Sequence, residues 1–198
     1  MVLSLPSNPP IGVIDPNTYS VQEKAFEESV LGQRWGLNES EKKTVMSKLR
    51  VISQKPEYAE TLNKLMTCAL TFVPPPTDPT KWDDNFDAVK IASETHPVLV
   101  DNDIVRILNV MDKPRFKGPL HTHKWSSIEI VLQAAAIRYY NEKGEKTVFP
   151  ASSDEDRVEI LNPEGLHTVK TKDTVAYHAL RFEIKSKKNL PEKNYESN

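Results

Sequence analysis

The chain is poor in cysteine, which could cross-link it, and in glycine, which gives the backbone its greatest freedom. Its 198 residues include one cysteine, Cys68, and only six glycines against fifteen prolines. A single cysteine excludes an internal disulfide framework and a zinc cluster built on thiolates. Its neighbours Leu65, Met66 and Leu70 favour a small apolar side chain on a helix face over a reactive thiol.

Long apolar runs, excess charge and glycine-rich phosphate loops are also lacking. No apolar stretch approaches the roughly 20 residues of a membrane span. The net charge of −2 gives no electrostatic reason to expect nucleic acid or an anionic membrane as a partner. The N-terminal residues have no basic stretch and soon reach proline, so a signal peptide is not expected. These features predict a globular, cytoplasmic protein that binds neither nucleic acid nor membrane.

The first 80 residues are expected to form an extended arm and a helical extension, closed by a proline-rich link at 74–79. Apolar residues at helical spacing predict three helices, at about 20–36, 38–52 and 56–72. Asn38 and Glu41 have the spacing of a capping box, and Gly36 is placed to end the first helix. We interpret this part as a helical cap that packs on the main domain or on a second subunit.

The period of the apolar pattern changes to two after residue 97. Residues 81–188 are therefore predicted to form an all-β barrel or sandwich, and residues 189–198 a disordered tail. Residues 141–145 have the composition of a hairpin turn, and residues 163–165 that of a second turn. About eight strands are expected, at 97–100, 104–110, 118–123, 127–140, 147–149, 157–161, 166–170 and 176–184.

Histidines are concentrated in these strands. His121 and His123 lie two residues apart, and side chains at that spacing on a strand point to the same face. His167 follows the predicted turn at 163–165. In the last strand, alternation separates His178, with apolar neighbours, from the charged set, which is expected to face water. His178 is therefore predicted to face the barrel interior as a fourth histidine.

The order of these motifs resembles the two-part signature of the cupin superfamily, in particular small cupins of the RmlC-like jelly-roll type. The resemblance rests on the segments 119–125 (Pro-Leu-His-Thr-His-Lys-Trp) and 162–167 (Asn-Pro-Glu-Gly-Leu-His) and covers roughly residues 97–185. It implies a double-stranded β-barrel, commonly a homodimer, with a divalent transition metal (Fe, Mn, Ni or Zn). It also implies His121, His123 and His167 as the metal ligands.

The sequence departs from the cupin pattern at the expected glutamate. Ser127 stands at the position where the family has its glutamate, and Ala134 stands where the strand should end in glycine. Glu129 lies two residues further along the same strand face, so it is the candidate catalytic carboxylate. An exposed carboxylate on the outer face of the barrel is the alternative.

Other side chains are candidates for the pocket. Trp125 is expected at the barrel mouth, and Tyr139 or its neighbour Tyr140 should point inward. Arg106 and Arg138 are candidate anchors for a substrate carboxylate, although solvated arginines on outer faces are more frequent. The long segment between the motifs, at 141–157, is expected to be a hairpin and surface loop that could cover the mouth as a lid.

Three imidazoles with or without a carboxylate leave coordination positions open for a substrate or for dioxygen. The leading hypothesis is a metal-dependent cupin enzyme that acts on a small organic molecule, with a dioxygenase as the class that the resemblance favours. The alternative is a non-enzymatic ligand-binding or structural cupin with a vestigial metal site. The missing glutamate and glycine favour that alternative.

Overall fold

The structure is a computed structural model that describes residues 16–150, 158–172 and 174–186. Three predicted segments lie outside the described residues: the arm before residue 16, the part of the lid at 151–157, and the tail at 189–198. No helix in the described part of the chain is long and apolar enough to cross a membrane.

Three helical segments come first and match the predicted ones. The first is α-helical over Pro16–Ala25 (α1) and continues as a π-helix over Phe26–Arg34 (η1). Gly36 ends it with a φ of +70°, a conformation that a residue without Cβ adopts without strain. The predicted capping box is present, because the Asn38 side chain accepts from the backbone N–H of Glu41 and the Glu41 side chain accepts from that of Asn38. The later helices are α2 (Glu39–Leu49), η2 (Arg50–Ile52) and α3 (Tyr58–Thr71).

Three short helices link this part to the strands: η3 (Pro79–Lys81), η4 (Asp84–Phe86) and α4 (Ala88–Ile91). The strands are β1 (Val98–Asp101), β2 (Val105–Asp112), β3 (His121–His123), β4 (Ser127–Gln133), β5 (Ile137–Asn141), β6 (Lys146–Phe149), β7 (Val158–Leu161), β8 (Glu164–Thr171) and β9 (Tyr177–Ile184). The predicted strand at 127–140 is thus two strands, because the chain leaves one sheet after Gln133 and enters the other at Ile137.

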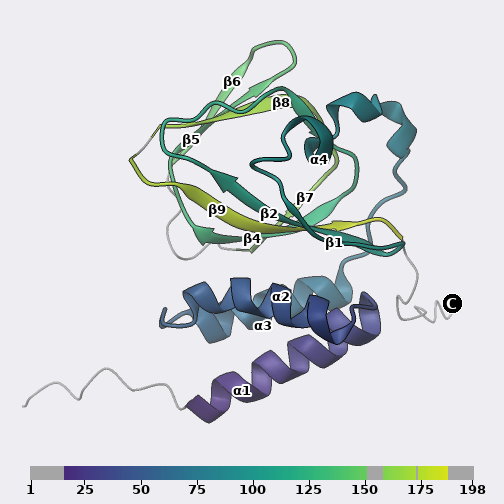
Figure 1. Cartoon of the computed structure of the whole chain (residues 1–198), viewed down its shortest axis with the longest axis vertical. Helices are drawn as coiled ribbons and strands as arrows, with labels where there is room; N and C mark the ends of the chain where they lie inside the picture. The colour runs from purple at the N-terminus through teal and green to yellow at the C-terminus, as the bar shows by residue number, and fades with distance from the viewer. Residues whose placement is uncertain (1–15, 151–157, 173, 187–198) are drawn as a thin grey trace, which may run out of the picture.

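The strands form two antiparallel sheets that enclose a barrel (Figure 1). The five-stranded sheet has the order β1-β2-β9-β4-β7, and the four-stranded sheet has the order β3-β8-β5-β6. With the edge strand β1 set aside, the orders β2-β9-β4-β7 and β3-β8-β5-β6 are those of an eight-stranded jelly roll, in which β5 and β6 form a hairpin within one sheet and the other successive strands change sheet. The predicted mainly-β fold with an N-terminal helical extension is therefore confirmed.

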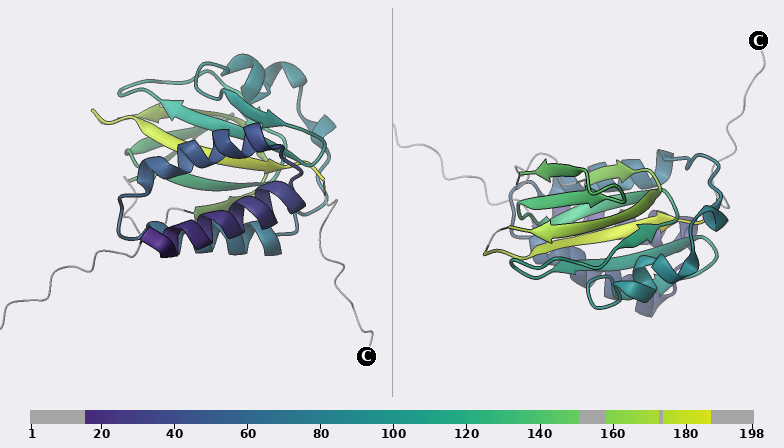
Figure 2. Two further views of the ribbon diagram at one scale, coloured as in Figure 1. Left: turned by 60° about the horizontal axis from the view of Figure 1, so that its bottom comes forward. Right: turned by 90° about the horizontal axis from the view of Figure 1, so that it is seen from above.

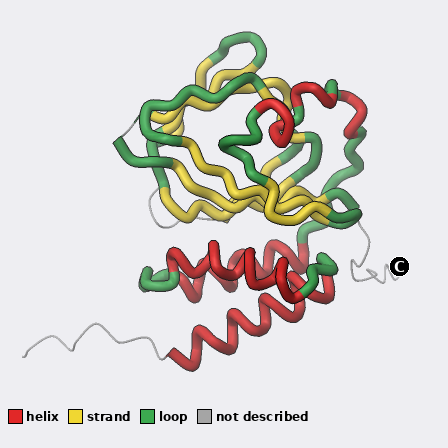
Figure 3. The backbone as a smooth tube through the Cα atoms, in the orientation of Figure 1, coloured by secondary structure: helices red, strands yellow, loops and turns green. Residues whose placement is uncertain are grey.

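The helices cover the outer face of the five-stranded sheet (Figures 2 and 3). Buried side chains of the helices and of this sheet form one continuous apolar cluster, in which Trp35 stacks on Phe182 at 5.0 Å. The apolar residues Leu180, Phe182 and Ile184 of β9 face the helices, so the charged residues of β9 face the barrel interior. This overturns the prediction that the charged set faces water. Alternation separated the two faces correctly, but both faces of β9 are buried.

Candidate metal centre

The three histidines of the motif meet inside the barrel. His121 and His123 lie on β3, and His121 pairs with His167 on the neighbouring strand β8. The imidazole centroids of His121 and His167 are 4.3 Å apart, and those of His123 and His167 are 5.6 Å apart. All three side chains are almost fully buried. Pairing of adjacent strands and the two-residue spacing on β3 together bring the rings to one place.

Glu164 joins this group, and sequence reasoning missed it. The predicted turn at 163–165 is wrong, because β8 begins at Glu164, which pairs with His123. A register shift between the two pairs acts like a β-bulge and lets Glu164 and His167, three residues apart, face the same side. One potential ligand atom from each of His123, Glu164 and His167 lies within 4.8 Å of the others.

His96 is a fourth histidine of the cluster and comes from outside the motif. It lies between α4 and β1, and the backbone bond from the N–H of Met111 to the carbonyl of Thr95 (2.8 Å) anchors its segment to β2. Its ring centroid is 4.8 Å from that of His121 and 5.2 Å from that of His123. Ligand atoms of these three histidines also lie within 4.8 Å of one another. No regular spacing in the sequence links residue 96 to residue 121, so only the fold could reveal it.

Each of the four rings has its Nδ1 atom in a hydrogen bond with an oxygen. The partners are the carbonyls of Pro119 for His121 (3.0 Å) and of Gly165 for His167 (2.8 Å), the carboxylate of Glu183 for His123 (2.8 Å) and the hydroxyl of Thr95 for His96 (2.9 Å). Carbonyls and carboxylates only accept, and the Thr95 hydroxyl already donates to the carbonyl of Ala92 (3.2 Å). The Nδ1 atoms therefore carry the protons, and no hydrogen bond joins the Nε2 lone pairs to another residue in the described part of the chain.

Burial keeps these rings neutral. Desolvation lowers the pKa of His121 to about 4 and moves the pKa of His96 and of His123 well below the usual value. The pKa of His167 is lowered for the same reason. Neutral imidazoles with fixed tautomers are the form that binds a metal ion. The donor set of imidazoles and one carboxylate, without a thiolate, fits Fe(II), Mn(II), Ni(II) or Zn(II).

Glu183 of β9 is a carboxylate that contacts the histidine cluster, and sequence reasoning placed it in water. It pairs directly with Ser127 in the ladder between β4 and β9, so the two side chains lie on the same face. Ser127 is fully buried, and its hydroxyl has no hydrogen-bond partner among the described residues. The carboxylate that binds His123 thus comes from β9, opposite the serine that stands at the family's glutamate position.

Arg106 holds Glu183 from the side away from the cavity. Its guanidinium binds Glu183 at 2.5 Å and Asp87 at 2.9 Å. Trp125 covers this guanidinium at 4.6 Å and does not line the cavity. Contrary to expectation, Arg106 therefore does not anchor a substrate in the cavity, because it belongs to a buried ion-pair network behind the site. Trp125 packs on that guanidinium instead of standing at the mouth of the cavity.

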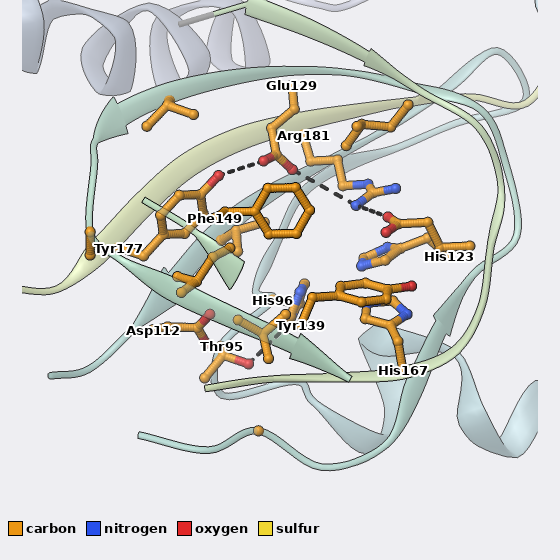
Figure 4. A pocket seen from close by; sticks show the side chains of 18 of the residues that line it. Thr95, His96, Asp112, His123, Glu129, Tyr139, Phe149, His167, Tyr177 and Arg181 are labelled. Atoms are coloured by element: carbon orange, nitrogen blue, oxygen red, sulfur yellow. Dashed lines mark hydrogen bonds and ion pairs between the residues drawn. The ribbon is translucent and has the colours of Figure 1, made fainter. Parts of the chain in front are cut away.

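A cavity of about 310 Å³ adjoins the imidazoles. Figure 4 shows His123 and His167 at one end, Asp112 and Tyr177 at the other, His96 between them, and Arg181 near His123 and Glu129. Apolar side chains such as Val110, Val131, Ile137, Phe149 and Leu161 form much of the remaining wall. The size lies at the lower end of the range for small-ligand pockets.

Glu129 lies in this cavity and not on the outer face of the barrel. It accepts a hydrogen bond from the Tyr177 hydroxyl (2.6 Å), and the Arg181 guanidinium is 3.8 Å away. Burial raises its pKa. Figure 4 shows Arg181 between Glu129 and the imidazoles, so Glu164, and not Glu129, is the carboxylate that joins the imidazole cluster.

Tyr139 is the inward-pointing tyrosine of β5. Its ring stacks on His167 with centroids 4.8 Å apart, and it lines the cavity. Burial raises its pKa to about 12, so its phenol keeps its proton at neutral pH. Arg138, its neighbour, does not line the cavity, which removes it as a substrate anchor.

His178 does not face the barrel interior, contrary to the prediction. Its Nε2 atom hydrogen-bonds the side chain of Asn109 (2.7 Å). Burial lowers its pKa, and the charge of Lys48 on α2 adds to this lowering. His178 shares the face of β9 that packs against the helices, because it alternates with Tyr177 and Ala179. Four of the five histidines do gather in the barrel, but the fourth is His96.

The sheet order and the inward histidines define the fold as a cupin double-stranded β-barrel. The sequence matches no family model and no curated protein. Similar solved structures include a cupin domain from Bordetella pertussis (14% identity, TM-score 0.39, 46% of this chain and 92% of the other). They also include an RmlC-like cupin from Methanocaldococcus jannaschii (12%, 0.36, 46% and 80%) and a cupin-like protein from Thermotoga maritima (14%, 0.34, 46% and 67%).

Proposed function

We propose that the protein is a metal-dependent cupin enzyme that binds one divalent transition metal ion and converts a small organic molecule in the adjoining cavity. One observation carries the proposal: four buried imidazoles have their Nδ1 protons committed to oxygen acceptors, and among the described residues their Nε2 atoms have no hydrogen-bond partner. Burying these neutral rings side by side without a ligand would leave their acceptor atoms unsatisfied.

The proposed ligands are His96, His121, His123 and His167, with Glu164 as an additional oxygen donor. Close ligand atoms form two groups, His96 with His121 and His123, and His123 with Glu164 and His167. His123 belongs to both groups, so it would be a ligand of an ion bound in either one. A bound ion would supply Lewis acidity or, for iron, the activation of dioxygen. The protein would contribute the fixed ring orientations, the exclusion of water by the apolar walls, and protons held on Tyr139 and Tyr177.

Metal binding is tested by titrating the metal-free protein with Co(II) and recording the visible absorption spectrum. We expect saturation at one ion per chain, with bands typical of nitrogen and oxygen ligands, and competition by Zn(II). A His121→Ala, His123→Ala double variant should give the spectrum of free Co(II), while His178→Ala should titrate like the unmodified protein. A featureless titration of the unmodified protein would contradict the proposal.

The reaction class is tested separately, with dioxygen-dependent oxidation as the proposed class. Fe(II)-loaded protein is incubated with pooled small organic acids in an oxygen electrode, and the pools are analysed by mass spectrometry. We expect oxygen uptake and loss of a pool member, both abolished in the double variant. A pool member that binds but is recovered unchanged, without oxygen uptake, would favour the alternative of a non-enzymatic binding protein.

Two further proposals rest on the sequence alone. A homodimer is implied by the resemblance to cupins, and sedimentation equilibrium should give twice the chain mass of 22.5 kDa. A cytoplasmic location follows from the composition and is tested by cell fractionation.

A further inference from the structure

Arg181 is a buried cation in the cavity whose hydrogen-bonding capacity is only partly used. It lies on β9 and is 4% exposed. Its Nη1 atom forms an ion pair with Glu164 at 2.6 Å. Among the described residues, its Nε and Nη2 atoms have no hydrogen-bond partner. A buried guanidinium with two unsatisfied nitrogens is costly, so a ligand or water oxygen is needed beside them.

The carboxylates around Arg181 do not satisfy these nitrogens. Glu129 is 3.8 Å from Nη1, and Glu183 is 4.0 Å from Nε, which is beyond hydrogen-bond distance. Glu183 is also bound more closely by Arg106 and by His123. The Nε and Nη2 edge of the guanidinium is the edge that binds a carboxylate through two parallel hydrogen bonds.

A bound divalent ion would make the surroundings of the imidazoles more favourable to an anion. The guanidinium groups of Arg106 and Arg181 lie among the carboxyl groups of Asp87, Glu129, Glu164 and Glu183. Burial raises the pKa of both Glu129 and Glu183, and the ion would add two positive charges to this group.

We propose that Arg181 anchors the carboxylate of a small monoanionic acid whose apolar body lies between Val131, Ile137 and Phe149. The inference rests on the proposed metal site, since the ion supplies added positive charge beside Arg181. In this proposal Arg181 is the residue that selects an acid over an amide or an amine. The sequence had suggested Arg106 and Arg138 for that role.

The test uses Zn(II)-loaded protein and three probes of one shape: phenylacetate, phenylacetamide and 2-phenylethylamine. Isothermal titration calorimetry should show phenylacetate binding at least about tenfold more tightly than the amide, and the amine binding most weakly. Arg181→Lys keeps the charge but removes the planar pair of donors, so the preference for the acid over the amide should fall about tenfold. Arg138→Lys, on the outer face of β5, is the matched control and should keep the preference.

A second measurement needs no variant at the site. In a ¹⁵N–¹H spectrum of arginine Nε groups, phenylacetate should shift one buried resonance, and phenylacetamide should not. A folded Arg181→Lys protein with an unchanged preference would overturn the inference, as would equal affinity for acid and amide in the unmodified protein. The zinc content of each sample is measured first: protein that takes up no zinc overturns the proposed metal site and this inference together, while zinc-loaded protein without the preference overturns only the inference.

Discussion

The Nδ1 atom of His123 lies 2.8 Å from a carboxylate oxygen of Glu183, and both side chains are buried. This hydrogen bond joins the predicted histidine motif to Glu183, which the alternating pattern of β9 had predicted to face water. A carboxylate that accepts the Nδ1 proton fixes the tautomer and makes Nε2 more basic. Glu183 is therefore a positioning residue for a metal ligand.

Replacing Glu183 by glutamine should weaken metal binding without removing a ligand. Loss of the charge on the acceptor lowers the basicity of His123, and changes of this kind typically cost 10- to 100-fold in metal affinity. The zinc dissociation constant, measured in competition with a chromophoric chelator, should rise by that factor. Because the substitution also breaks the buried ion pair with Arg106, circular dichroism must first show a folded variant. The exposed Glu142→Gln variant should leave the constant unchanged.

Removing His96 should reduce metal affinity, although it lies outside the two segments, 119–125 and 162–167, that resemble the cupin signature. We expect the zinc dissociation constant of His96→Ala to rise at least about tenfold, because one of the four inward Nε2 atoms is lost. His178→Ala is the matched control, since His178 bonds Asn109 on the face of β9 toward the helices. Equal zinc affinities of the two variants would show that His96 is not a ligand.

Asp112 should make the protein less stable as the pH rises. Burial raises the pKa of Asp112 from 3.8 to about 6, so the unfolded chain ionises this carboxyl at lower pH than the native state does. The unfolding free energy therefore falls between about pH 4 and pH 6, by about 2–3 kcal/mol for a shift of this size. Asp112→Asn should melt several degrees higher than the unmodified protein at pH 7 and at the same temperature near pH 4.

The exposed turn residue Asp103 provides the control for this experiment. Asp103→Asn should leave the melting temperature unchanged at both pH values. A melting difference for Asp112→Asn that is the same at pH 4 and pH 7 would contradict the role assigned to burial.

The helical layer should be part of the cooperative fold and not an independent appendage. Trp35 is 1% exposed and stacks on Phe182 of β9, and truncating a buried aromatic side chain of this size costs about 3–5 kcal/mol. Urea denaturation of Trp35→Ala should show that loss in a single transition, followed both by helix signal and by near-ultraviolet signal. Val51→Ala, at a 59% exposed position, should change stability by less than about 0.5 kcal/mol. Two separate transitions would show that the helices unfold on their own.

Local patterns in the sequence were enough to predict the barrel, the helices and three of the histidines. The spacing of His121 and His123 determines a shared face on any strand, and the capping box at Asn38 depends only on residues within one turn. The residues that were missed depend on long-range contacts. His96 reaches the site through the pairing of its segment with β2, and Glu164 through the register of β3 and β8.

The wrong predictions for β9 have a common physical cause. Placing Arg181 and Glu183 toward water assumed that each strand has one buried face and one solvated face. The helices cover the outer face of β9, so both faces are buried, and the charged residues are accommodated inside by ion pairs with Arg106 and Glu164. The same assumption placed His178 inside the barrel.

The central claim is that the imidazole cluster holds a metal ion, and elemental analysis tests it most directly. The protein is purified without a histidine tag, incubated with Fe(II), Mn(II), Ni(II) or Zn(II), freed of excess ion and analysed for metal per chain. We predict one equivalent of at least one of these metals in the unmodified protein and none in the His121→Ala, His123→Ala double variant. Unmodified protein that stays free of metal under all four conditions would contradict the account.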